Sequence, residues 1–159
     1  MDVSRNQTDA QRHATLSQAL KQLRSRRGFR SADVAREMGI SHRNYQRFER
    51  GELGLDLEKI FGFADVVRAD PWGIVFAAEF GSVNFALYCA DNQAISLLLT
   101  MLRRFDRQAG KDIAALDPRS LALIFRRSFE QISLRAQEFH ADLEQWMFDE
   151  TFGDPDDED

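Results

Sequence analysis

The sequence has 159 residues, of which 43% are hydrophobic, and a formal net charge of −5, which suits a globular protein of one medium domain or two small ones. Its single cysteine, Cys89, excludes an intramolecular disulfide framework and a thiolate-rich zinc site, and it lies in an apolar run where we expect a buried, unreactive thiol. The nine glycines and three prolines mostly stand where a helix would end, and no stretch alternates with a period of two, so the predicted fold class is all-α.

The charge is divided unevenly along the chain. Residues 12–50 hold ten Lys/Arg and three Asp/Glu, a balance of +7, whereas residues 61–159 hold nine and eighteen, a balance of −9. Because a basic surface attracts phosphates and an acidic surface repels them, this division predicts a DNA-binding domain joined to a body that does not bind DNA. The alternative is that the basic residues only solvate one helical bundle.

The chain shows no pattern that predicts export or insertion into a membrane. Residues 1–12 are polar, and the longest apolar runs, such as residues 95–102, are well short of the ~20 residues needed to cross a bilayer. We therefore expect a cytoplasmic, nucleoid-associated protein without a membrane partner.

Five short helices are predicted within residues 9–80, which would make a complete domain. They cover residues 11–27, 31–38, 41–50, 56–68 and 70–80. Ser41 is the predicted N-cap of the third helix, and Asp70 with Pro71 opens the fifth. The side chains predicted to face the core of this domain are Ala14, Leu16, Ala19, Leu20, Leu23, Leu57, Ile60, Phe61, Ala64, Val67, Trp72, Val75, Phe76 and Phe80.

Residues 81–150 are predicted to form a helical dimerisation or partner-binding region, and residues 151–159 a disordered acidic tail. Residues 82–90 are apolar but too short to distinguish a helix from an extended segment. Helices are predicted over residues 91–109, with Ile95, Leu98, Leu99, Leu102 and Phe105 inward, and from residue 117 to about residue 148. The longer helix carries an apolar stripe of Leu121, Ile124, Phe125, Phe129, Ile132, Ala136, Phe139, Leu143 and Trp146.

An apolar stripe of this length has to be buried, and the chain has no other predicted helix long enough to bury it. The shorter helix would be about 28 Å long and the longer one about 45 Å, at 1.5 Å per residue. We therefore predict that the end at Phe139–Trp146 mediates a two-fold homodimer, which would suit paired half-sites on DNA. Another protein and packing within the chain are the alternative covers.

Residues 32–51 carry the pattern of two helices joined by a sharp turn. Ala35 is small enough for the helices to cross closely, Gly39 permits the turn, and Ile40, Tyr45 and Phe48 would hold the third helix against the first two. The polar residues near the beginning of the third helix then face outward. Side chains placed in this way reach the base edges in the major groove of DNA.

These residues resemble the phage-repressor class of helix-turn-helix domains, also called xenobiotic-response-element regulators. The resemblance covers about residues 16–80 and includes the motifs Leu23-Arg24, Arg27-Gly28, Val34-Ala35, Met38-Gly39-Ile40-Ser41 and Phe48-Glu49-Arg50-Gly51. It implies five helices, a third helix in the major groove and often a dimeric operator. It also implies an internal salt bridge between Arg24 and Glu49, which would join the first helix to the end of the third.

The resemblance implies a set of DNA-binding residues, which are Ser31, Ser41, His42, Arg43, Asn44, Gln46 and Arg47. Ser31 stands where the family commonly has a glutamine, Arg30 takes the usual place of a capping threonine, and residues 52–56 are acidic where many relatives are basic. Arg26, Arg27 and Arg47 are further expected to neutralise phosphates. For Arg43 the alternative is a solvated surface arginine, and for His42 and Asn44 it is a role at the helix start alone.

The predicted function is a sequence-specific transcriptional regulator that binds double-stranded DNA and has no catalytic residue, metal or cofactor. The three histidines are too far apart in the sequence for a metal site, and no glycine-rich phosphate loop is present. The expected partners are DNA, a second copy of the chain, and a protein such as RNA polymerase or a co-regulator. The alternatives are a helix-turn-helix protein-interaction adaptor, a transcriptional co-activator that acts through a protein partner, and an accessory subunit of a nucleic-acid enzyme.

Overall fold

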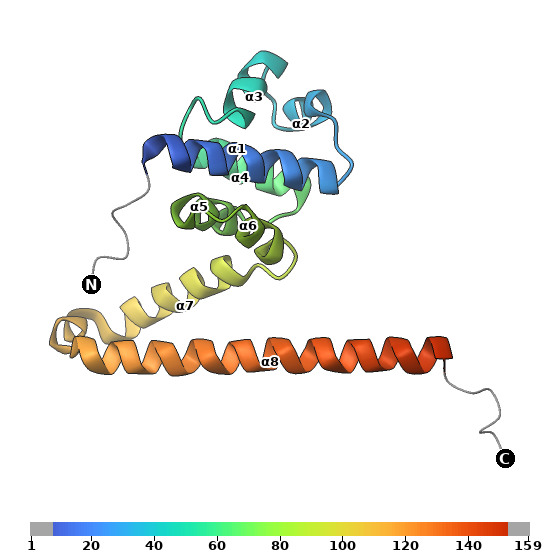
Figure 1. Cartoon of the computed structure of the whole chain (residues 1–159). Helices are drawn as coiled ribbons and strands as arrows, with labels where there is room; N and C mark the ends of the chain where they lie inside the picture. Colours follow the sequence, from blue (N-terminus) through green and yellow to red (C-terminus); the bar gives the residue numbers. More distant parts are fainter. Residues whose placement is uncertain (1–7, 153–159) are drawn as a thin grey trace. The chain divides into compact units, whose positions relative to one another are not determined.

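The computed structural model describes the backbone of residues 8–152 and the side chains of residues 8–139. The described residues form helices and contain no strand, so the predicted all-α class is confirmed (Figure 1). In chain order the helices are α1 (Asp9–Arg26), α2 (Ser31–Glu37), α3 (His42–Glu49), α4 (Leu57–Val67), α5 (Pro71–Phe80), α6 (Val83–Cys89), α7 (Ala94–Ala109), the 3-10 helix η1 (Gly110–Ala115) and α8 (Pro118–Phe152).

The chain divides between residues 108 and 109 into an N-terminal and a C-terminal unit. In the N-terminal unit, α1 lies between the α2–α3 pair and the α5–α6 pair (Figure 1). Its core contains the fully buried side chains of Leu16, Leu20, Tyr45, Phe48 and Phe63. Burial of a large apolar side chain contributes roughly 1.5–3 kcal/mol, so this core is the main source of stability for the unit.

Side chains that accept hydrogen bonds from free backbone amides begin most of these helices. Thr8 forms a capping box with Gln11, and Ser41, Asp56 and Asp70 each accept a hydrogen bond from an amide in the first turn of the following helix. Capping residues can be recognised in the sequence because they act within one turn of the helix. This explains why the predicted bounds of the first five helices lie within two residues of those observed.

The N-terminal unit extends beyond the predicted domain of residues 9–80. Residues 83–89, which the sequence left undecided, form α6, and α6 packs against α1 and α5. The carboxylate of Asp70 then accepts hydrogen bonds from the amides of Ile95 (2.8 Å) and Ser96 (3.2 Å) and from the Ser96 hydroxyl (2.6 Å). These bonds attach the beginning of α7 to the beginning of α5.

Part of the predicted core of the N-terminal unit is wrong. The predicted core residues that prove exposed are Ala14, Leu57, Phe61, Phe80, Leu102 and Phe105, and those that are only half-buried are Trp72, Val75, Phe76, Leu98 and Leu99. The helix α5 instead buries Gly73, Ile74, Ala77 and Ala78. A Cβ at Gly73 would lie 2.9 Å from the Cβ of Cys89, so α5 turns its small side chains toward α6 and its aromatic rings outward.

The C-terminal unit consists of η1 and the long helix α8, which begins after Asp117. The Asp117 carboxylate accepts hydrogen bonds from the amide and the hydroxyl of Ser120, both at 2.9 Å. The side chains of Leu143 and Trp146, at the predicted dimer end, lie outside the described residues. Most of the predicted tail also lies outside them, although α8 continues through Phe152.

In the described part of the chain, no single helix is long and apolar enough to span a membrane. Only the pair Val83–Cys89 and Ala94–Ala115, bent by 77°, passes that test of length and composition together.

Candidate nucleic-acid interface

The turn between α2 and α3 is sharp and well anchored. Gly39 has a φ of 67°, which favours glycine, and the amide of Ile40 donates to the carbonyl of Ala35 (3.0 Å). Ser41 then accepts a hydrogen bond from the amide of Asn44 (3.2 Å) and begins α3. At the other end of α3, Gly51 has a φ of 76°, and a Cβ there would lie 2.5 Å from the carbonyl oxygen of His13. Gly39 and Gly51 therefore determine the direction of the chain immediately before and after α3, and so the position of α3 against the core.

Helix α3 has one buried side and one exposed side. Tyr45 and Phe48 are fully buried, and the Phe48 ring packs edge-on against those of Tyr45 and Phe63, each with centroids 6.2 Å apart. Of the predicted DNA-binding residues, the structure exposes Ser41, His42, Arg43, Gln46 and Arg47 and leaves Ser31 and Asn44 half-buried. All seven lie on α2 or α3 or in the turn between them.

An ion pair joins α1 to the end of α3. Arg24 donates from Nε and Nη2 to the carboxylate of Glu49 (2.6 and 3.4 Å) and from Nη1 to the carbonyl of Phe29 (3.0 Å). The buried hydroxyl of Tyr45 donates to the same carboxylate (2.9 Å). The hydrogen bond to Glu49 raises the pKa of Arg24, and burial next to that carboxylate raises the pKa of Tyr45. This group positions α3 rather than presenting charge to a ligand.

The first residues of α2 and α3 are linked by Ser31 and His42. The Ser31 hydroxyl lies 2.9 Å from Nε2 of His42, within hydrogen-bonding distance for either tautomer. This bond holds the His42 ring close to the beginning of α2. His42 is therefore a less mobile side chain than an isolated surface histidine.

A carboxylate neutralises part of the charge near the end of α3. Glu52 accepts from Nε of Arg50 (2.7 Å) and from Nε of Arg47 (3.2 Å). The hydrogen bond from Arg50, supported by that from Arg47, lowers the pKa of Glu52, so the carboxylate is ionised at neutral pH. Among the described residues, the side chain of Arg43 by contrast has no ion-pair or hydrogen-bond partner.

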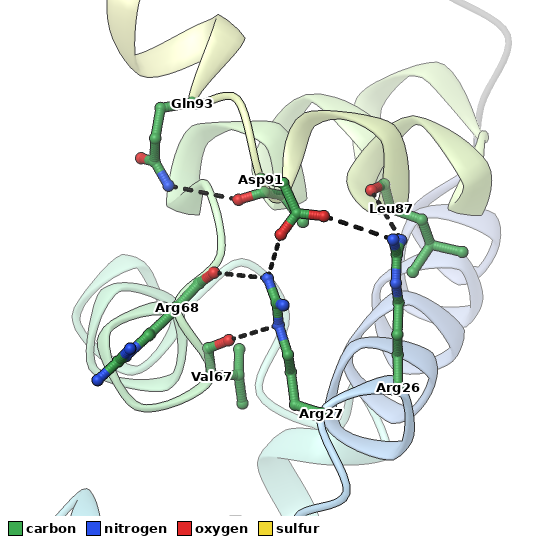
Figure 2. A network of polar contacts seen from close by, with 8 residues as sticks. Arg26, Arg27, Val67, Arg68, Leu87, Asp91 and Gln93 are labelled. Atoms are coloured by element: carbon green, nitrogen blue, oxygen red, sulfur yellow. Dashed lines mark hydrogen bonds and ion pairs between the residues drawn. The ribbon is translucent and has the colours of Figure 1, made fainter. Parts of the chain in front are cut away.

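Arg26 and Arg27, which are expected from the sequence to neutralise phosphates, have ion-pair and hydrogen-bond partners within the N-terminal unit. Figure 2 shows both side chains pointing toward the turn between α6 and α7. Arg27 donates to the carbonyls of Val67 and Arg68, each at 3.1 Å, and pairs with Asp91. Arg26 donates to the carbonyl of Leu87 (3.3 Å) and pairs with Asp91 (3.4 Å). These two arginines join helices of the N-terminal unit.

The exposed residues at the beginning of α3 border an open depression of about 300 Å³, lined by Ser41, Arg43, Asn44 and Arg47. Its lining has two arginines, a serine hydroxyl and an amide, and the depression faces the first turn of α3. Such groups donate hydrogen bonds to phosphate and base oxygens. No cluster of residues that could hold a metal ion is found in the part of the chain that the structure describes.

The two helices, the glycine turn and the buried side of α3 are the parts that define a helix-turn-helix. Residues 15–71 match the family model of a helix-turn-helix domain. The match supports a DNA-binding helix-turn-helix family, whose members are typically not enzymes, and does not distinguish the phage-repressor type. Neither the curated proteins nor the solved structures gave a match to the chain.

Proposed function

We propose that this protein is a sequence-specific transcriptional regulator of the phage-repressor type that inserts α3 into the major groove of double-stranded DNA. The observation that carries the proposal is the placement of His42, Arg43, Gln46 and Arg47, which are exposed on a helix whose other side is buried. A helix held in this way presents its side chains without deforming the domain.

The chemistry of each side chain suggests its role on DNA. Arg43 is unpaired and forms two parallel hydrogen bonds to a guanine, and Gln46 does the same with an adenine. Ser41, Asn44 and Arg47 line the depression and contact phosphates, which sets the register of α3 without reading sequence. Ser31 acts through its bond to His42.

The protein acts as a homodimer on paired half-sites in the cytoplasm, at the nucleoid. Without an intrinsic reaction, it represses by blocking RNA polymerase or activates by contacting polymerase or a co-regulator. No cofactor or metal takes part in this proposal.

Selection of binding sites from a pool of random duplexes with the full chain tests the proposal. We expect enrichment of one consensus, repeated at a spacing of about one helical turn. Enrichment of no sequence, together with retention of all duplexes only at low salt, would reject sequence-specific regulation.

A second candidate is a helix-turn-helix adaptor or co-activator that acts through a protein partner. Glu52 neutralises Arg47 and Arg50, and Arg26 and Arg27 bind within the N-terminal unit, so few unpaired cations remain near α3. Absence of any mobility shift with duplex DNA would favour this candidate.

A further inference from the structure

Helix α8 carries a row of exposed apolar side chains. Phe125, Phe129, Ile132 and Phe139 are all half or more exposed, with Phe139 at 65%. An exposed row of this kind is unusual in a soluble protein and indicates an interaction surface.

The row follows the spacing of a coiled coil. Alternating steps of three and four residues place Ala122, Phe129, Ala136 and Leu143 at heptad position a, and Phe125, Ile132, Phe139 and Trp146 at position d. A repeat of 3.5 residues, instead of the 3.6 of a straight helix, keeps one seam of the helix facing one partner helix. The sequence of α8 therefore favours another helix as its cover.

The charges of α8 change sign at its midpoint. Residues 118–135 contain four arginines and one glutamate, a balance of +3, and residues 136–152 contain five Asp/Glu and no Lys/Arg, a balance of −5. This order is unfavourable within one helix, because the helix dipole stabilises acidic residues at the beginning and basic residues at the end. The ion pair of Arg126 with Glu130 (3.6 Å) also runs in the less favourable direction. The basic first half and acidic second half of α8 are therefore better explained by charges on a partner helix than by interactions within α8.

We propose that α8 packs against α8 of a second copy of this chain as an antiparallel two-stranded coiled coil. In that orientation the basic half of each helix meets the acidic half of the other, whereas a parallel pair would set like charges together. The two-fold axis crosses near the middle of α8, and the seam from residue 122 to residue 146 is about 36 Å long at 1.5 Å per residue.

A second copy suits this surface better than the chain's other exposed helix. With 16 residues, α7 could cover less than half of the 35-residue α8. A second α8 matches both the length of the seam and the order of the charges. The inference deepens the proposed function, on which it rests for the use of paired half-sites, but self-association is measured without DNA and can therefore fail independently.

Sedimentation of the full chain over a wide concentration range, compared with two variants, tests the seam. Ile132→Asp places a charge on the seam, and Leu134→Asp is its matched control, because the two side chains are similarly exposed (63% and 58%) but Leu134 is at position f, away from the seam. We expect a dimer that Ile132→Asp weakens at least about a hundredfold, since the substitution enters each dimer twice, while Leu134→Asp leaves it intact. A monomeric wild type, or equal effects of both variants, would overturn the proposal.

The orientation has its own test. In a Cys89→Ala background, Ala122→Cys and Trp146→Cys proteins, whose positions a and d face each other in the antiparallel pair, should cross-link with each other when mixed and not each with itself. Self-cross-linking of Ala122→Cys alone would show a parallel pair and reject the antiparallel arrangement.

Discussion

The arginines of the N-terminal unit have three different environments, although each adds the same charge. Arg24 pairs with the buried Glu49, Arg27 pairs with Asp91 and binds two carbonyls, and Arg43 projects into solvent without a partner. Only the third kind is ready to bind phosphate or guanine. The local balance of +7 over residues 12–50 therefore overstates the charge that DNA would meet.

Arg43→Ala should weaken binding to the selected duplex by about 1–3 kcal/mol and relax the preference at one base position. The reason is that its guanidinium is free to pair with one guanine. Arg103→Ala, which removes an exposed arginine of α7, is the control and should leave the consensus unchanged. An unaltered consensus and affinity in Arg43→Ala would contradict the base-reading role.

Glu52→Gln should strengthen DNA binding several-fold. The substitution removes the negative charge that pairs with Arg47 and Arg50 and keeps the shape of the side chain. With up to two cations released, the slope of log affinity against log salt should steepen by about one to two. Glu58→Gln, an exposed residue of α4, makes the same charge change away from α3 and serves as control; an equal gain in both variants would indicate a general charge effect.

The raised pKa of Tyr45 predicts a loss of stability in alkali. In the unfolded chain, Tyr45 ionises once the pH rises above its ordinary pKa of 10.0. In the folded chain, burial beside Glu49 raises the pKa and keeps the hydroxyl protonated. The folded state then binds more protons than the unfolded state, so the free energy of unfolding falls as the pH rises above about 10. Tyr45→Phe should flatten this fall in urea titrations, although at neutral pH it loses about 1.5–3 kcal/mol with the hydrogen bond to the charged Glu49.

The control for this prediction is Tyr88→Phe, which changes an exposed ring on α6. It should keep the alkaline loss of stability that the wild type shows. Parallel pH profiles for the wild type and Tyr45→Phe would mean that Tyr45 does not cause the loss.

At the scale of the element, Asp70 connects two helices that are far apart in the sequence. It is fully buried, caps α5 through the amide of Trp72 (3.1 Å) and accepts three further hydrogen bonds from Ile95 and Ser96 in α7. A buried carboxylate that accepts several hydrogen bonds holds the donating segments in place, because each donor would otherwise lack a partner. The attachment of α7 thus depends on one side chain.

Asp70→Ala should lower the free energy of unfolding by about 2–4 kcal/mol, because it removes a helix cap and leaves buried donors unsatisfied. Asp56→Ala removes the cap of α4 and the ion-pair partner of Lys59, both within one helix, and should cost about 1 kcal/mol. Urea unfolding gives both values, and hydrogen exchange should show the amides of Ile95 and Ser96 exposed in Asp70→Ala. Equal losses in the two variants would mean that Asp70 acts only as a cap of α5.

Helix ends could be predicted from the sequence better than buried sides. Ser41 and Asp70 act on amides within the next turn, so their effect is visible locally. The buried side of α5 depends on a contact between Gly73 and Cys89, which no periodicity reveals. The seven residues of α6 are too few to define a period, and their helix is stabilised by packing on α1 and α5.

In the candidate site, too, local features could be predicted from the sequence and contacts with residues outside the motif could not. The exposed side of α3 could be predicted because Tyr45 and Phe48 mark the buried side. The pairing of Glu52 with Arg47 and the use of Arg27 within the fold could not, because each requires the position of a residue outside the motif. A motif therefore predicts which face is presented but not how much of its charge is free.

At the scale of the whole molecule, the proposed α8 dimer would determine how the N-terminal units use paired half-sites. Two linked DNA-binding domains bind two half-sites with an avidity that exceeds the affinity for one by about 10²–10⁴-fold, provided that the linkage allows both to bind. Ile132 lies in α8, far along the chain from the residues proposed to contact DNA. A substitution there should change avidity without changing how one unit binds one half-site.

Ile132→Asp should therefore reduce the affinity for a duplex with two half-sites by about 10²-fold or more and leave the affinity for a single half-site unchanged. Leu134→Asp, the control outside the seam, should bind both duplexes like the wild type. Mobility-shift titrations with the two duplexes measure all the affinities at one salt concentration. Loss of single-half-site binding in Ile132→Asp would mean that α8 supports the DNA-binding unit itself, and unchanged affinity for the paired site would mean that the two units bind independently.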